Sequence, residues 1–195
     1  MEERKLCENI ILADADYIDK VAFDLTVNFE RMIGRRIPKA DMPRWADCVA
    51  LDGGIRQGEN NIQVILIHNK ETTRIENFAP SDIVKELDGK AFKDNLGEFL
   101  FSAIPVEDMV DKEHLFCDSL MNVCSQPEVK RVMVIPNADE YYDGVRHALK
   151  NVDDDKRITV FAMQPMAGGN FRQEILGYSL MSALGIRSEE LEDWN

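Results

Sequence analysis

Acidic side chains follow two of the predicted strands at the points where those strands end. Asp14 and Asp16 come after the apolar run at residues 9–13, and Asp139 follows the apolar run at residues 132–135. Parallel strands place their carboxyl ends at one edge of a sheet, and open α/β folds bind ligands at that edge. We therefore expect these three carboxylates to share one region of the folded protein.

Further polar groups belong to the same predicted edge. Asp111 and Asp118 lie in the helix expected ahead of the apolar run at residues 132–135, and Asn137 and Glu140 lie close to Asp139 in the sequence. Several carboxylates that converge in this way form a site of hard oxygen ligands, which suits Mg²⁺ or Mn²⁺. A bound ion of this kind can activate a water molecule against a phosphodiester.

The same acids have a second interpretation as helix N-caps. Asp14 or Asp16 is placed to cap the helix that starts near Tyr17, and Asp111 is placed to cap the helix that ends near Pro127. Asp118 lies at the border of an apolar helical stripe, so it faces either solvent or a cleft. Both interpretations stay open at this point.

The apolar segments predict the fold class. Short apolar runs of strand length alternate with helical patterns, which is typical of a parallel sheet with helices on both faces. The predicted strands are residues 9–13, 62–68, 98–104, 132–135 and 158–163. The sequence thus predicts an α/β protein of PIN or Rossmann type, a three-layer αβα sandwich with a mainly parallel five-stranded sheet. We expect one domain over residues 1–195, with its core at about 8–164.

The helical segments carry their own start and stop signals. Apolar spacing predicts a helix that Gly34 ends, and Asp41 with Pro43 predicts the start of another. We interpret Gly53 and Gly54 as the end of that second helix, since the spacing of a phosphate-binding loop is missing. The polar stretch that follows is predicted to be irregular, with a short helix that Ser81 caps.

A last helix is predicted over residues 171–184, apolar on more than one face. That breadth suggests packing both on the domain and on a second copy of the chain, so we expect a homo-oligomer through this segment.

The composition limits the partners and the compartment. A formal net charge of -13 opposes a dominant nucleic-acid surface, so RNA binding is expected to be weak at most. The four cysteines show no CxxC pair and are expected to be reduced core thiols. No stretch resembles a signal peptide or a membrane span, and we expect a cytoplasmic protein.

Four segments, taken in order, resemble a known family. The segments ILADAD, KEHLFCDSLMNV, VKRVMVIPNADEYYDGVRHALKN and DKRITVFAM are similar to the PIN-like superfamily and, within it, to the NYN ribonuclease-type domains. The resemblance covers about residues 8–164 in its order of elements. It implies a metal-dependent nuclease fold, with acids after the first strand, within the helix before the fourth strand, and in the turn after the fourth strand.

The resemblance assigns roles to individual residues and also shows departures. Asp14 matches the first metal-binding Asp, and Asp118 matches the acid within the helix. Lys112 stands where a further acid is expected, with Asp111 one place away. After the fourth strand, Ala138 replaces an expected Asp, which leaves Asp139 and Glu140 as substitutes, and Pro136 replaces a small residue.

Three functions follow as hypotheses. The first is a nuclease or phosphodiesterase with Asp14, Asp118 and Asp139 as ligands of Mg²⁺ or Mn²⁺, and with Asp16 or Asp111 positioning the water. The second is a noncatalytic PIN-like module for protein interaction or assembly. The third is a binder of a small ligand at the carboxyl edge, which the missing glycine-rich phosphate loop makes weaker.

Overall fold

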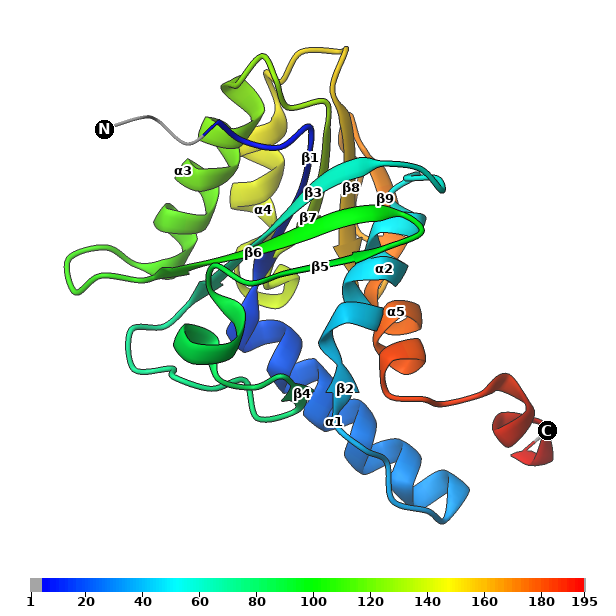
Figure 1. The fold of residues 1–195 in the computed structure, drawn as a ribbon. Coiled ribbons are helices and arrows are strands. Elements are labelled where there is room, and N and C mark those ends of the chain that lie inside the picture. Colours follow the sequence, from blue (N-terminus) through cyan, green and yellow to red (C-terminus); the bar gives the residue numbers. More distant parts are fainter. Residues whose placement is uncertain (1–4, 195) are drawn as a thin grey trace.

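The computed structural model describes residues 5–194 and is built around a seven-stranded sheet of order β5-β6-β3-β1-β7-β8-β9 (Figure 1). The five predicted strands are present as β1 (Asn9–Asp14), β3 (Asn60–His68), β6 (Gly97–Pro105), β7 (Arg131–Ile135) and β8 (Arg157–Ala162). Each pairs in parallel with its neighbours among these five. The α/β class is confirmed.

The prediction of only five strands was wrong, because both edges carry one more. At one edge β5 (Ala91–Asp94) pairs with β6 in antiparallel fashion, so the sheet is mixed. A tight turn joins the two strands, and Phe92 stacks on Phe99 at 4.5 Å between ring centroids. Gly97 completes the turn at φ 135°, where a β-carbon would stand 2.0 Å from the Asn60 carbonyl oxygen. The polar character of this stretch hid the hairpin.

The other edge changes the start of the predicted last helix. Residues Arg172–Ile175 form strand β9, parallel to β8, and helix α5 spans only Leu176–Ala183. Its apolar breadth is used inside the domain, since Leu176, Leu180 and Ala183 join the main core and α5 packs on α2 (Met42–Asp52). The breadth is therefore explained without a second copy, and the homo-oligomer stays a prediction.

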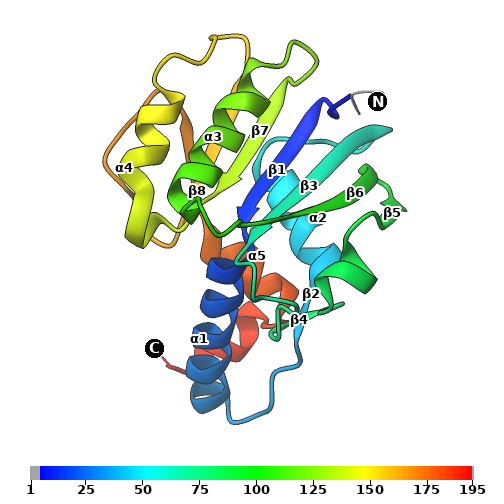
Figure 2. The same cartoon turned by 90° about the vertical axis from the view of Figure 1, so that its left-hand side faces the viewer.

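Helices cover both faces of the sheet (Figure 2). Helices α1 (Ala15–Ile33), α2 (Met42–Asp52) and α5 pack on one face, and α3 (Lys112–Ser125) and α4 (Ala138–Leu149) pack on the other. A three-layer αβα arrangement is thus present. In the described part of the chain, none of the helices has both the length and the apolar character that a membrane span requires.

Several predicted caps are confirmed by hydrogen bonds. The carboxylates of Asp14, Asp41 and Asp111 each accept from a backbone N–H in the first turn of α1, α2 and α3. Gly34 and Gly53 end the first two of these helices. The short helix predicted from Ser81 is instead a single π-helical turn at Ile83–Leu87 with Asp82 as its cap. The remaining elements are the two-residue strands β2 (Ala40–Asp41) and β4 (Phe78–Ala79) and a 3-10 helix at Ser188–Trp194.

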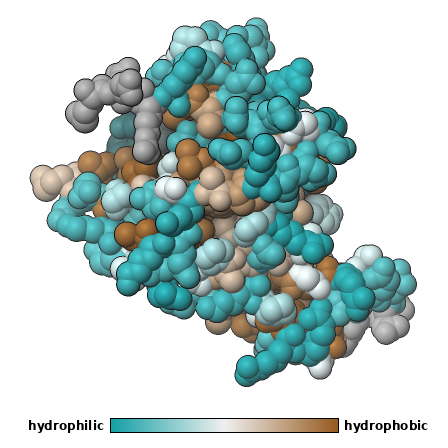
Figure 3. Space-filling model, in the orientation of Figure 1, coloured by the Kyte–Doolittle hydropathy of each residue, from teal (hydrophilic) through white to brown (hydrophobic). Residues whose placement is uncertain are grey.

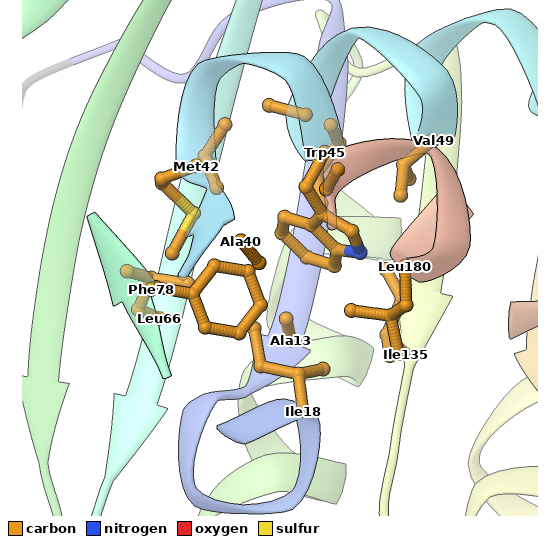
Figure 4. Packing of buried hydrophobic residues seen from close by; sticks show 14 of the residues in the cluster. Ala13, Ile18, Ala40, Met42, Trp45, Val49, Leu66, Phe78, Ile135 and Leu180 are labelled. Atoms are coloured by element: carbon orange, nitrogen blue, oxygen red, sulfur yellow. The ribbon is translucent and has the colours of Figure 1, made fainter. Parts of the chain in front are cut away.

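The larger core lies between the sheet and α1, α2 and α5. Trp45 of α2 is fully buried and meets Phe78 edge to face at 6.0 Å between ring centroids (Figure 4). Ala13 of β1 and Ile135 of β7 lie beneath them and belong to the same cluster. This packing anchors the ends of the two central strands, from which the candidate site residues project.

One contact between two acids joins α2 to the edge strand β5. Asp47 of α2 lies against the carboxyl of Asp94 at the end of β5. Burial, followed by the hydrogen bond and charge of Asp94 and the charge of Asp41, raises the pKa of Asp47 to about 7. A protonated Asp47 can donate to Asp94, whereas two ionised carboxylates repel each other.

Replacing Asp47 by Asn should remove part of the pH dependence of stability. Between the ordinary Asp pKa of about 4 and the raised value, the folded state binds more protons than the unfolded state. The free energy of unfolding therefore falls as pH rises through this range. The amide cannot ionise, so urea denaturation should find Asp47→Asn more favourable relative to wild type at about pH 8 than at about pH 5. Asp155→Asn, at an exposed position, is the control and should respond to pH as wild type does. If the stability of Asp47→Asn also changes with pH as that of wild type does, the pairing of Asp47 with Asp94 is contradicted.

Candidate functional site

Asp14 lies at the centre of the carboxyl edge. It is the last residue of β1, which runs between β3 and β7, so the predicted neighbourhood of the first and fourth predicted strands is confirmed. Its side chain is 0% exposed. Oδ1 accepts a hydrogen bond of 3.1 Å from the backbone N–H of Tyr17, which caps α1. A buried carboxylate requires further partners, because desolvation of a charge is costly.

Lys112 supplies the main partner. It is the first residue of α3, and its Nζ lies 3.2 Å from Oδ1 of Asp14 and 2.8 Å from Oδ2 of Asp16. The Lys112 side chain is itself only 19% exposed. One ammonium group thus bridges two carboxylates at the end of β1.

Both carboxylate oxygens of Asp16 also accept hydrogen bonds from the protein. Its Oδ2 accepts from the backbone N–H of Asn69 at 2.7 Å, and its Oδ1 accepts from the hydroxyl of Thr72 at 2.5 Å. Burial alone raises the pKa of Asp16, but the hydrogen bonds from Lys112, Thr72 and Asn69 outweigh it, and the net pKa is lowered. Asp16 therefore ties the loop after β3 to the start of α1.

Two tyrosines lie next to these carboxylates. The hydroxyl of Tyr141 donates to Oδ2 of Asp14 at 2.7 Å, and both side chains are buried. Tyr141 has φ -136° and ψ 31°, which breaks the helical geometry within α4 and turns its ring toward Asp14. Tyr17 lies near Asp139, and burial, together with the charges of Asp139 and Asp14, raises the pKa of Tyr17 to about 12.

The net effect on Asp14 is a raised pKa. Burial is the largest cause, and the Lys112 ammonium, the Tyr141 hydroxyl and the Tyr17 N–H offset it only in part. All three partners are hydrogen-bond donors, which suits the carboxylate form. We refer to Asp14, Asp16, Lys112, Tyr141 and Thr72 as the Lys112 group.

The predicted acids do not all meet here. Asp14 and Asp16 share Lys112, and Asp139, exposed in the first turn of α4, reaches the group through Tyr17. Asp118 is exposed on α3, six residues from Lys112, and Asp111 caps α3 and pairs with His114 at 2.7 Å. Six residues along a helix turn the side chain of Asp118 well away from that of Lys112.

The expected metal ligands are therefore not gathered into one coordination sphere. Within residues 5–194, no three His, Cys, Asp or Glu side chains form a group that could hold a metal ion. The oxygens of Asp14 and Asp16 already accept hydrogen bonds from protein donors. The donor set of the Lys112 group does not fit Mg²⁺, which needs free carboxylate oxygens and bound water.

Sequence reasoning missed Tyr141, Tyr17 and Thr72. Tyr141 reaches Asp14 through the irregular backbone at its own position, which helical spacing does not reveal. The departure at Lys112 was the one available signal. A lysine in the place of an expected acid indicates a salt bridge with the remaining carboxylates.

Comparison with known proteins gives one family. The family of unknown function DUF6621 matches residues 3–191. No curated protein and no solved structure matches the chain.

Tyr141→Phe should lower the free energy of unfolding by about 2 kcal/mol, because it leaves a buried carboxylate oxygen without its donor. Tyr142→Phe is the matched control. Its hydroxyl donates to the Ala167 carbonyl in a partly buried position, so its loss should cost less than about 1 kcal/mol in the same urea titration. Equal losses in the two variants would show that the Tyr141 hydroxyl does not satisfy Asp14.

Proposed function

The chain belongs to the DUF6621 family, and we propose that it is a noncatalytic protein-interaction module built on a PIN-like scaffold. The observation that carries this proposal is the position of Lys112. Its ammonium lies between Asp14 and Asp16, where the PIN-like resemblance implies a metal ion. A covalently attached cation of this kind offsets one of the two carboxylate charges but has no coordination position for a water molecule or a phosphate.

The surroundings of the group favour a protein partner over a nucleic acid. Exposed acids surround this edge in the loop before α3 and in the first turns of α3 and α4, namely Glu107, Asp108, Asp111, Glu113, Asp139 and Glu140. Together with the net charge of -13, they repel a phosphate backbone.

The loop between β6 and α3 adds an apolar tip to this acidic edge. Met109 is 94% exposed and Val110 is 43% exposed. Figure 3 shows an apolar protrusion at the left, where Figure 1 places this loop. A flexible methionine beside carboxylates suits a basic protein segment that also carries an apolar side chain.

Lys112→Ala should destabilise the fold and create a response to divalent ions. The variant leaves Asp14 buried without its cation, which should lower the free energy of unfolding by about 3 kcal/mol. Millimolar Mg²⁺ or Mn²⁺ should raise the melting temperature of the variant, because an ion that binds only the folded state stabilises it. The same ions should leave wild type unchanged, and RNA incubated with wild type should stay intact.

Lys70→Ala provides the control. Lys70 pairs with Asp108 at 2.7 Å, but both side chains are largely exposed, so its loss should cost less than about 1 kcal/mol and create no metal response. A wild-type protein that Mg²⁺ stabilises, and that cleaves RNA in its presence, would establish the metal-dependent nuclease instead.

A further inference from the structure

Four arginines gather at the amino edge of the sheet, opposite the Lys112 group. Arg131 and Arg157 begin β7 and β8 and are direct cross-strand partners in parallel register. Arg172 begins β9 opposite Thr159, two residues beyond Arg157, so all three side chains leave the same face of the sheet. Arg56 follows the end of α2, where the Gly53 carbonyl accepts a hydrogen bond from Arg131.

The protein leaves most of this positive charge without a counter-ion. Arg131 donates to the Gly53 carbonyl at 3.1 Å, and Arg56 donates to its neighbouring Ile55 carbonyl at 3.3 Å. Within the described residues, Nε of Arg131 is buried and has no hydrogen-bond partner. Among residues 5–192, Glu174 is the carboxylate that pairs with an arginine of the cluster, at 3.5 Å from Arg172. Asp52 lies close enough to Glu174 for the charge of Glu174, after burial, to raise the pKa of Asp52.

The charges of the four arginines act on one another. Burial, followed by the charges of Arg157, Arg56 and Arg172, lowers the pKa of Arg131. Like charges placed directly opposite each other on neighbouring strands destabilise a sheet. The carbonyl end of α2 offers about half a negative charge, which accounts for the position of Arg131 but not for the other three arginines.

Gly54 allows two of these guanidinium groups to lie close to the backbone. A β-carbon on Gly54 would stand 2.8 Å from Nη1 of Arg131 and 3.8 Å from Nη1 of Arg172. Both guanidinium groups therefore lie next to the same bare stretch of backbone. Arg56, Arg157 and Arg172 are exposed, so a ligand can reach these side chains from solvent.

We propose that Arg56, Arg131, Arg157 and Arg172 form a binding site for a compact phosphate-bearing anion. A single carboxylate carries one negative charge, which is too little to balance this cluster, whereas pyrophosphate or a phosphate monoester carries about two or more near neutral pH. The guanidinium fork also matches phosphate oxygens in bidentate geometry. The site shares no residue with the Lys112 group and does not depend on the function proposed for it.

Titration calorimetry with sodium pyrophosphate tests the site on the full chain at low ionic strength. Wild type should bind pyrophosphate, while sodium chloride at matched ionic strength should give no saturable heat. Arg157→Gln should weaken the affinity by about tenfold or more, since it removes one charged partner of the phosphate. Without ligand, the melting temperature of Arg157→Gln should equal or exceed that of wild type, because one like-charge contact is lost.

Arg146→Gln is the matched control. Arg146 is an exposed arginine on α4, beside Asp143 and outside the cluster, so its loss should leave pyrophosphate binding unchanged. A nucleoside monophosphate titrated in parallel separates the two sources of phosphate, since the tighter ligand shows whether a free phosphate or a phosphate ester is preferred. The site would be disproved by absent pyrophosphate binding in wild type, by equal affinities in Arg157→Gln and Arg146→Gln, or by binding of single-stranded RNA without any binding of pyrophosphate.

Discussion

The burial of the Asp14 carboxylate is the constraint on which the carboxyl edge depends. The side chain is 0% exposed at the end of the central strand, so its charge has to be satisfied by the protein itself. Its partners come from α1, α3 and α4, through Tyr17, Lys112 and Tyr141. One carboxylate thus determines how three helices from both faces of the sheet start or bend at this edge.

Asp16 extends the same network to the loop that follows β3. Its two carboxylate oxygens accept hydrogen bonds from Lys112, Asn69 and Thr72. The Lys112 ammonium therefore connects the start of α3 with the residues after β3 through Asp16. Elements far apart in the sequence are therefore joined by a single cation. The loss of this cation affects several loops at once, which distinguishes it from the exposed pair of Lys70 and Asp108.

Much of this arrangement was predictable from local patterns. Buried strands appear as apolar runs, and Asp14, Asp41 and Asp111 stand directly before helical spacing, so their capping roles could be inferred. The proximity of the ends of β1 and β7 was expected because open α/β folds bind ligands at the carboxyl edge of the sheet. These features depend on near neighbours in the chain or on general topology.

The features that escaped prediction depend on tertiary contacts. Strand β5 exists because Phe92 stacks on Phe99, and β9 exists because the edge of β8 offers hydrogen-bond partners. Tyr141 reaches Asp14 only through a local break in α4, which no periodicity reveals. Lys112 was visible as a departure from a family pattern, but its contact with both Asp14 and Asp16 needed the fold.

The two edges of the sheet differ in how far their charged side chains are paired within the protein. At the carboxyl edge, two carboxylates are matched within the protein by an ammonium, two hydroxyls and backbone N–H groups. At the amino edge, the charges of the four arginines act on one another, and Glu174 is the carboxylate among the described residues that pairs with one of them. An added ion stabilises a site little when the protein already pairs its charges. Like charges without partners are stabilised when a counter-ion binds them.

The chemistry of an ammonium explains why this difference bears on function. A divalent ion between Asp14 and Asp16 would keep water in its remaining positions and could lower the pKa of that water. The Lys112 ammonium has only N–H groups to offer, and Asp14 and Asp16 already accept from them. It cannot take an oxygen ligand as a Lewis acid does. The same two carboxylates that would bind a catalytic ion here fix the start of α3. The surface of this helix and its preceding loop is then the feature that the proposed interaction function would use.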